Sequence, residues 1–407
     1  MSEPTLKRDI GFTLLTLYGL GTILGAGIYV LIGEVARSAG TAAPSAFLIS
    51  ALMAGFTAFS YAELAARLPR SAGEAAYVAE GFRWPAAATA VGWAVIVTGV
   101  VSAATMTRGF VGYLDLFVSV PPPLVICALV GAVACLAAWG ISESLLLAGI
   151  VTIVEVAGLV LVCVVAGSSL SELPQRWTEL LPSADIASVL GILSGSFVAF
   201  YAFIGFEDMV NVAEEVREPR TTLPRAIVTA LIVSTILYVF IAVIAVLSMP
   251  TDALAGSAAP LALIVESRGV SPRLIGLISL FAVLNGALVQ MIMASRVLYG
   301  LADQGLSWRI FARINARTRT PLYATAVVAA CVLVFALGFS LDRLARFTSF
   351  IALIVFSMVN VSLWRLKKEQ SDRAVFSVPV AVPVLGFLLC TGMICYQTVM
   401  WLSAVIE

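Results

Sequence analysis

The sequence contains no histidine and only three lysines, and charged residues make up 12% of its 407 positions. Membrane enzymes such as prenyl transferases gather acidic or histidine metal ligands at a membrane face, and this chain has no paired acid-rich motifs of that kind. A retinal-type pump needs a lysine within a span, whereas Lys7, Lys367 and Lys368 lie outside the apolar runs. We therefore expect neither an enzyme nor a metal or other cofactor.

An excess of charge of one sign is also missing, because 24 Lys and Arg balance 24 Asp and Glu, which argues against nucleic acid as a partner. The cysteines show no paired metal-ligand spacing and fall within apolar segments, where they act as small hydrophobes. These cysteines are Cys127, Cys135, Cys163, Cys331, Cys390 and Cys395. We expect no disulfide and no metal site from them.

The sequence is instead rich in long apolar runs, with 61% hydrophobic residues and a mean hydropathy of +1.04. This composition is typical of an all-α, multi-pass protein of the lipid bilayer. A window of about 20 residues, the length of helix that crosses the hydrocarbon, predicts eleven spans. They are 10–33, 43–66, 84–107, 123–140, 143–167, 186–212, 223–248, 272–300, 322–339, 343–364 and 377–403. The first run follows Lys7 and Arg8 as a signal peptide would, but its length favours a retained span.

Basic residues are distributed unequally between the two alternating sets of loops. Of the 24 Lys and Arg, 17 lie on the side of the N-terminus and 7 on the other side. Because cytoplasmic loops carry the excess of Lys and Arg, the N-terminus is predicted to be cytoplasmic. An odd number of spans then places Glu407 outside the plasma (inner) membrane.

The first span contains four glycines in "GLGTILGAGIYV", residues 19–30. Glycine in a membrane helix usually marks close helix packing. Here Gly25, Ala26 and Gly27 lie together at mid-span after Thr22, which leaves the backbone unshielded over about one turn. A helix broken at this point exposes N–H groups where the local dipole is positive, and such a break persists in lipid only if it lines a cavity or a ligand satisfies it.

A second interruption is predicted in the sixth span, in "GSFVAFYAFIGFEDMVNVAEEVREPR". Gly205 lies at mid-depth and is followed by Glu207 and Asp208. An alternative is that these carboxylates end the helix early at the water, but about five apolar or small residues follow before Glu214. Acidic residues inside spans usually have a role. Spans one and six are five apart, so two repeats of five helices would run in opposite directions through the membrane.

Three stretches resemble the amino acid, polyamine and organocation (APC) transporter superfamily, in its amino acid permease branch. They are "GLGTILGAGIYVLIGEVARSAG", "FIGFEDMVNVAEEVREPRTTLPRAI" and "LNGALVQMIMASRVLYGLADQGLSWRIFARINARTRTP", and they cover about a quarter of the chain. The resemblance implies a LeuT-like fold with discontinuous helices 1 and 6 and eleven transmembrane helices. The inverted repeats would span 1–168 and 186–366, with 377–407 as an additional helix of the same membrane domain.

The resemblance also implies an amino acid held at the membrane centre. Its carboxylate would accept hydrogen bonds from backbone N–H groups beside Thr22, and its ammonium would meet carbonyl groups of the sixth span. The expected carboxylate site is Ile23, Leu24, Gly25, Ala26 and Gly27, and the expected ammonium site is Phe203, Ile204 and Gly205. Tyr201 and Phe206 match aromatic gate positions and Glu207 the acidic gate, although helix packing is the alternative role for Phe200, Tyr201 and Phe206. Asn285, a mid-span amide, either contacts substrate or another helix.

Glu155 in the fifth span departs from the family pattern, because many relatives have a lysine there that reaches the broken first helix in place of a sodium ion. A carboxyl group in hydrocarbon can be neutral or charged according to water access, which suits a proton carrier. With no histidine, carboxylates are the groups left to titrate in the useful range. Glu155 could instead supply an oxygen to sodium, or be a permanently protonated residue bonded to a neighbouring helix.

The sequence thus predicts a secondary active transporter that moves amino acids by alternating access, with proton coupling through a buried carboxylate. The mid-span acids Glu155, Glu207 and Asp208 already have other expected roles, so a neutral, small to medium amino acid is favoured as substrate. An amino acid exchanger or a sodium-coupled symporter are the alternatives. A channel would need a ring of pore-lining groups rather than two broken helices.

Overall fold

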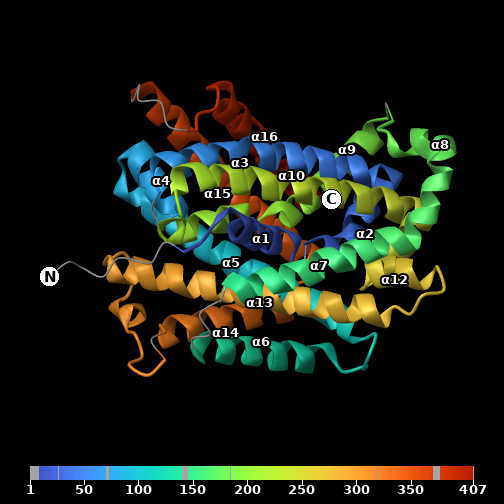
Figure 1. The fold of residues 1–407 in the computed structure, drawn as a ribbon, viewed down its shortest axis with the longest axis horizontal. Coiled ribbons are helices and arrows are strands. Elements are labelled where there is room, and N and C mark those ends of the chain that lie inside the picture. The colour runs from blue at the N-terminus through green and yellow to red at the C-terminus, as the bar shows by residue number, and fades with distance from the viewer. Residues whose placement is uncertain are drawn as a thin grey trace.

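The chain folds into a bundle of long helices that lie roughly side by side (Figure 1). The structure, a computed structural model, describes residues 9–25, 27–69, 73–139, 145–183, 185–318, 320–369 and 376–406. In this part of the chain the only β pairing is an isolated parallel bridge between Ile10 and Val216.

The long helices lie where the hydropathy of the sequence predicts spans. In chain order they are α1 (Phe12–Leu24), α2 (Gly27–Ala39), α3 (Ala43–Arg67), α5 (Pro85–Leu114), α6 (Pro122–Trp139), α7 (Leu145–Ala166), α9 (Ile186–Phe200), α10 (Pro219–Ser248), α13 (Arg273–Asp303), α14 (Leu322–Gly338), α15 (Leu341–Glu369) and α16 (Ala381–Ile406). Between them lie the short α4 (Gly73–Phe82), α8 (Leu173–Arg176), α11 (Thr251–Gly256) and α12 (Pro260–Glu266). The 3-10 helices η1 (Gly40–Ala42), η2 (Gly167–Glu172), η3 (Trp177–Leu180), η4 (Tyr201–Phe203), η5 (Phe206–Glu215) and η6 (Arg309–Ala312) complete the described elements.

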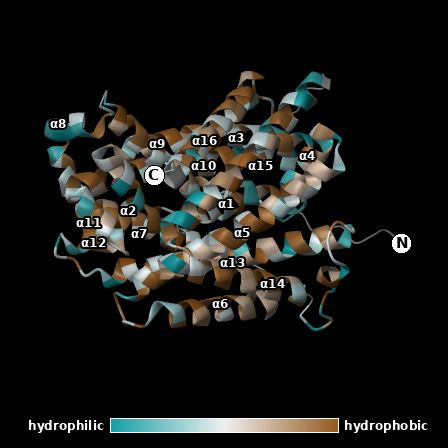
Figure 2. Cartoon of the chain, turned by 180° about the vertical axis from the view of Figure 1, so that it is seen from behind, coloured by the Kyte–Doolittle hydropathy of each residue, from teal (hydrophilic) through white to brown (hydrophobic). Residues whose placement is uncertain are grey.

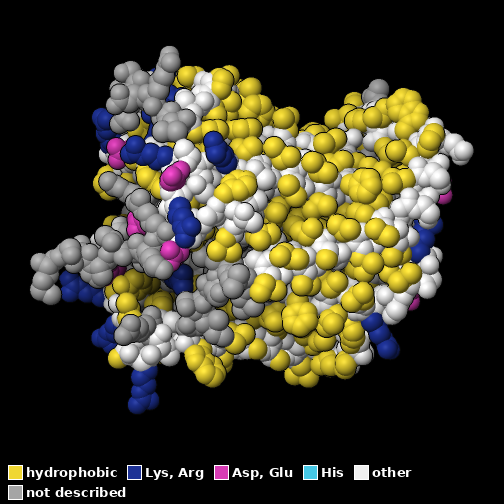
Figure 3. All heavy atoms as spheres, viewed as in Figure 1, with side chains coloured by type: hydrophobic (Ala, Val, Ile, Leu, Met, Phe, Trp, Pro, Cys, Tyr) yellow, Lys and Arg dark blue, Asp and Glu magenta, His cyan; other side chains and the backbone are white. Residues whose placement is uncertain are grey.

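Nine stretches of the described residues are long and apolar enough to cross a membrane. One of them, Phe12–Arg67, contains α1, α2 and α3, and α14 is a further apolar helix that is shorter. Hydrophobic residues run along these helices and cover much of the middle of the molecule (Figures 2 and 3). The chain is therefore a helical membrane protein, and the number of eleven crossings stays a prediction.

Helices that are far apart in sequence pack along one another in a regular way. The two most extensive pairs are α5 with α13 and α3 with α10, and α6 also packs along α14. One hydrophobic core lies around α1, α2, α3, α9 and α10, and a second around α5, α6, α13 and α14. The first core surrounds both interrupted helices.

Both interruptions expected from the sequence are present. The first helix ends at Leu24 and the next begins at Gly27, with Gly25 in a non-helical conformation between them. Ala26 lies outside the described residues. The second interruption follows η4, where Ile204 is extended and Gly205 has φ +133°, before the chain resumes as η5. The second half of the sixth span is thus a 3-10 helix that continues to Glu215, three residues beyond the predicted end of the span.

Candidate functional site

The two helix interruptions lie against each other in the middle of the bundle. A Cβ atom built on Gly27 would lie 2.6 Å from Cα of Ala202, and one built on Gly205 would lie 2.9 Å from the backbone nitrogen of Ile23. Real Cβ contacts are essentially never this short, so glycine at both positions is what allows the two backbones to approach. Gly205 also needs its freedom for its positive φ.

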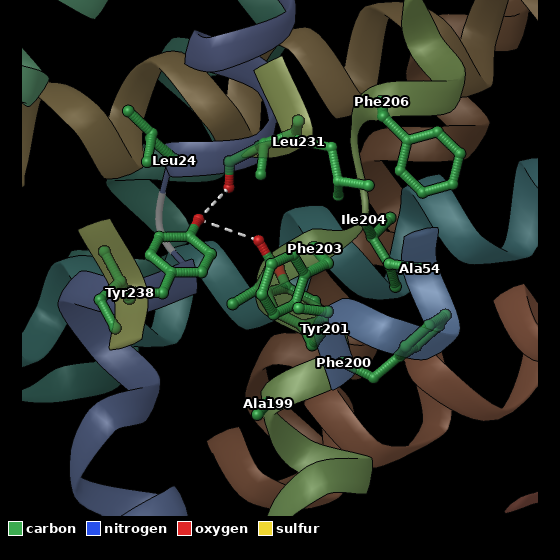
Figure 4. Packing of buried hydrophobic residues seen from close by; sticks show 14 of the residues in the cluster. Leu24, Ala54, Ala199, Phe200, Tyr201, Phe203, Ile204, Phe206, Leu231 and Tyr238 are labelled. Atoms are coloured by element: carbon green, nitrogen blue, oxygen red, sulfur yellow. Dashed lines mark hydrogen bonds between the residues drawn. The ribbon is translucent and has the colours of Figure 1, made fainter. Parts of the chain in front are cut away.

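Carbonyl groups released by the interruptions are bonded by side chains of neighbouring helices. The hydroxyl of Tyr238, on α10, lies 2.6 Å from the carbonyl oxygen of Ile23 and 2.9 Å from that of Ala202 (Figure 4). The hydroxyl of Thr22 lies 2.9 Å from the carbonyl oxygen of Gly205. A backbone group without a partner would be costly away from water, so these bonds stabilise both breaks.

Main-chain N–H groups at the interruptions have different partners. The N–H of Gly25 still donates to the carbonyl of Gly21, at 3.1 Å, and that of Gly205 donates to the carboxylate of Glu207, at 2.8 Å. The first turn of any helix has N–H groups without an intrahelical acceptor, and α2 begins inside the bundle at Gly27. The start of α2 is therefore one place where the structure can offer donors to an anionic group.

A small cavity adjoins the first interruption and brings together two of the predicted site residues, Thr22 and Asn285. Met106 and Val289 supply apolar walls, and Gln290 adds a second amide from α13. Of the predicted substrate residues, Thr22 and Asn285 are the ones that line this cavity, whereas Phe203 and Ile204 are buried in the first core.

A second small cavity lies on the other side of Gln290. Three acidic residues line it: Glu74 from α4, and Glu207 and Asp208 from η5. The Gln290 side chain donates to Asp208 over 3.3 Å, while its own oxygen is buried with no hydrogen-bond partner among the described residues. Burial raises the pKa of Glu74 to about 7, against an ordinary value of 4.5, although a hydrogen bond from Tyr61 acts in the opposite direction.

The predicted aromatic gates have defined contacts. The hydroxyl of Tyr201 lies 3.0 Å from that of Ser102 on α5. Phe206 packs edge-on against Tyr61, with ring centroids 5.4 Å apart, and lies 5.2 Å from the ring of Phe356. Phe200 and Phe203 are also buried in this core, as Figure 4 shows. Phe206 thus takes part in helix packing, and Tyr201 links the sixth span to α5.

Glu155 lies on α7 with 1% of its surface exposed, and neither carboxylate oxygen has a hydrogen-bond partner among the described residues. The hydroxyl of Tyr29, on α2, donates instead to the main-chain carbonyl of Glu155, at 2.6 Å. One turn earlier, the Thr152 hydroxyl fills the space next to Gly21 on α1. Helix α7 therefore packs against both halves of the first span. A bond from the Glu155 carboxyl to a neighbouring helix, which one of the three alternatives for this residue requires, is not seen among the described residues.

Three polar residues of the site were not predicted from the sequence. Gln290 could have been predicted from the sequence, because it is a second mid-span amide five residues after Asn285. Tyr238 is an ordinary aromatic within an apolar run, and only its contacts show its role. Glu74 lies between two predicted spans, so burial of its carboxyl could not be expected from hydropathy.

Comparison with known proteins identifies the family of the chain. Residues 10–404 match the family described as amino acid permease. The chain belongs to the amino acid permease family. The resemblance stated from the three sequence stretches is thereby confirmed, and this permease is a multi-pass membrane protein.

Individual relatives align with most of the permease, but they differ in how much of their own length it covers. It is 30% identical to a branched-chain amino acid permease of Bacillus subtilis, over 96% of this chain and 88% of that protein. It is 31% identical to a mitochondrial cationic amino acid transporter of Arabidopsis thaliana, over 88% of this chain and 62% of the relative, so it spans less than two thirds of that protein. A methylthioribose transporter of Bacillus subtilis is 25% identical over 99% of the permease and 92% of the relative.

Proposed function

We propose that this permease carries a neutral amino acid across the membrane by alternating access, with the substrate held between the two helix interruptions. The observation that carries the proposal is the meeting of these interruptions inside the bundle, with the start of α2 beside Ala202. The substrate carboxylate accepts bonds from N–H groups at this start, where the helix dipole is positive. Carbonyl groups of Phe203, Ile204 and Gly205 receive the ammonium, and the Gly205 carbonyl exchanges its bond to Thr22 for the substrate.

The proposed architecture is the LeuT-like fold with two inverted repeats, 1–168 and 186–366, and an additional helix in 377–407. The two interrupted spans are five apart, and three packed pairs, α3 with α10, α5 with α13 and α6 with α14, each join a predicted span to the one five later. Of the nine apolar stretches, Phe12–Arg67 forms two proposed crossings, one by α1 together with α2 and one by α3. The shorter helix α14 adds one more, which gives the eleven proposed crossings. The N-terminus then faces the cytoplasm.

A neutral side chain suits the mostly apolar character of the cavity beside Thr22, to whose lining Met106 and Val289 contribute together with Asn285. One observation favours a second candidate, a cationic amino acid. The acid-lined cavity with Glu207 and Asp208 lies just beyond Gln290, within reach of a long basic side chain. The relatives carry both kinds of name, branched-chain and cationic.

Glu155 is the proposed proton carrier. Its carboxyl is fully enclosed and lacks a cation or hydrogen-bond partner among the described residues, and α7 packs against α1 at Gly21. An acid in such a place can lose its proton only when water reaches it, and alternating access provides that opening. Sodium coupling and exchange are the competing mechanisms.

Uptake into proteoliposomes tests the proposal. Radiolabelled leucine should enter with saturable kinetics, and excess unlabelled leucine should compete while lysine and arginine should not. Non-saturable flux would indicate a channel, and competition by lysine would favour the cationic candidate. For coupling, leucine should acidify vesicles made with the wild type but not with Glu155→Gln, whereas Glu80→Gln, an exposed acid on α4, should behave as the wild type. An equal proton signal in the Glu155→Gln vesicles would remove Glu155 from the mechanism.

A further inference from the structure

A groove lies between α9, α14, α15 and α16, at the end of the bundle where α15 begins. Its volume is about 670 Å³. Four aromatic side chains contribute to its lining, Phe335, Phe339, Phe347 and Trp401, and Arg343 and Arg346 lie at its polar end. Aromatic residues and arginines placed together in this way are typical of the boundary between hydrocarbon and headgroups.

A polar cavity of about 250 Å³ continues from this end and shares Asp342, Arg343 and Arg346 with the groove. Arg346 is held in place, because its guanidinium lies 2.9 Å from the Asp342 carboxylate and 3.1 Å from the Ser194 hydroxyl. Arg37 is paired with Glu34 at 3.4 Å. Three guanidinium groups thus face two carboxylates, which leaves one positive charge.

Arg343 carries that remaining charge. It is exposed and makes no hydrogen bond or ion pair with any described residue, although it lies between the apolar groove and the polar cavity. A guanidinium group at this depth matches a phosphate in both charge and geometry.

Gln397 gives a second, independent indication of a ligand. It lines the groove from α16 and is 3% exposed, yet its side-chain oxygen has no hydrogen-bond partner among the described residues. A buried acceptor beside hydrocarbon is costly unless a donor reaches it. A headgroup that carries hydroxyl groups supplies such a donor.

We propose that this groove binds an anionic glycerophospholipid with a hydroxyl-bearing headgroup. Its phosphate pairs with Arg343, a headgroup hydroxyl donates to Gln397, and an acyl chain lies along Phe335, Phe339 and Trp401. One net negative charge on the lipid balances the one uncompensated arginine. This site is separate from the central interruptions and does not depend on the proposed transport function.

Native mass spectrometry of the purified permease with added phosphatidylglycerol tests the proposal. Arg343→Gln should weaken lipid retention about fivefold, the effect of losing one arginine near the membrane surface. Arg273→Gln is the matched control, because Arg273 is also exposed in the first turn of a long helix, and its side chain has no partner among the described residues. The control should retain lipid as the wild type does.

Gln397→Leu keeps the shape of the groove but removes the acceptor. It should weaken phosphatidylglycerol retention and leave the thermal stability of the lipid-free protein unchanged or higher. Phosphatidylcholine should be retained more weakly than phosphatidylglycerol by the wild type, and inorganic phosphate at the same concentration should not displace the lipid.

Three results would overturn the proposal. Equal retention by Arg343→Gln and Arg273→Gln would show that Arg343 does not hold the lipid. Displacement by inorganic phosphate alone would indicate a simple anion site without an acyl chain. A lipid-free dimer that dissociates on Arg343→Gln substitution would identify a second copy of the chain as the occupant.

Discussion

At Gly27 and Gly205 there is no room for a side chain, because backbone from the opposite interruption occupies the space where a Cβ atom would be. At Gly27 that backbone belongs to Ala202, and at Gly205 it belongs to Thr22 and Ile23. Many other glycines of the chain have no such neighbour, and a Cβ atom added to Gly131 on α6 would meet no described atom within 4 Å. Glycines of this chain therefore serve different purposes, and only the contacts distinguish them.

Gly27→Ala should weaken amino acid binding about tenfold, because a methyl group here pushes η4 away from the start of α2, and such overpacking costs roughly 1–3 kcal/mol. Thermal-shift titration with the transported amino acid measures the affinity. Gly131→Ala is the control, since it adds the same methyl group in open space. Equal affinities for the two variants would mean that the contact with Ala202 has no part in binding.

Glu74 should make the stability of the permease depend on pH. Its pKa is raised by burial to about 7 from 4.5, so between these values the folded state holds a proton that the unfolded state has released. The free energy of unfolding is then highest below about pH 4.5 and falls as pH rises toward 7, by on the order of 3 kcal/mol. Among the described residues, the groups near Glu74 include the hydroxyls of Tyr61 and Tyr77 and the acids Glu207 and Asp208.

Glu74→Gln should remove this part of the pH dependence while it keeps an acceptor for Tyr61. Thermal melts in detergent at pH 5 and pH 8 should converge in the variant relative to the wild type. Glu80→Gln, on the exposed side of the same helix, should keep the wild-type difference. A Glu74→Gln protein with an unchanged pH profile would show that Glu74 is not the titrating group.

At the scale of the elements, one hydroxyl group on α10 fixes the positions of the two interruptions relative to each other. Tyr238 reaches a carbonyl from each interruption, and its ring lies 5.1 Å from that of Phe203. The side chain therefore fixes α1 and η4 relative to each other as well as to α10.

Tyr238→Phe should lower stability by about 1–3 kcal/mol, because it leaves the carbonyl groups of Ile23 and Ala202 without this donor. Hydrogen exchange should rise at the end of α1 and in η4, and little elsewhere. Tyr323→Phe, on a side chain that is 49% exposed on α14, is the control and should change neither quantity. Uniformly increased exchange over the bundle would instead indicate a general packing defect.

Sequence reasoning predicted the helices well because the thickness of the bilayer fixes their length and composition. The ranges 123–140 and 322–339, for example, lie within one residue of α6 and α14. The interruptions were also predictable, since glycines and acids in an apolar run are local signals. The 3-10 form of η5 and the link through Tyr238 were not, because both depend on helices that are distant in the sequence.

At the scale of the whole molecule, the ends of the bundle differ in charge. Most of the charged side chains visible in Figure 3 lie at the end from which the N-terminus emerges. At this end the segment before α1 pairs with the end of η5 and the residues that follow it. The N–H of Ile10 donates to the carbonyl of Glu215, at 3.0 Å, and the N–H of Arg217 donates to the carbonyl of Ile10, at 2.8 Å. The two interrupted spans are thus joined at the basic end as well as at the centre.

The proposed orientation places this basic end in the cytoplasm, and the two ends of α13 allow a direct test. Ser271, just before α13, and Gln304, just after it, are both exposed at opposite ends of one helix. A membrane-impermeant maleimide should label Ser271→Cys in intact cells, and should label Gln304→Cys only after permeabilisation. The wild type controls for its six native cysteines, which lie in apolar segments. The reverse labelling pattern would invert the topology and place the excess of arginine outside, against the rule that basic loops stay in the cytoplasm.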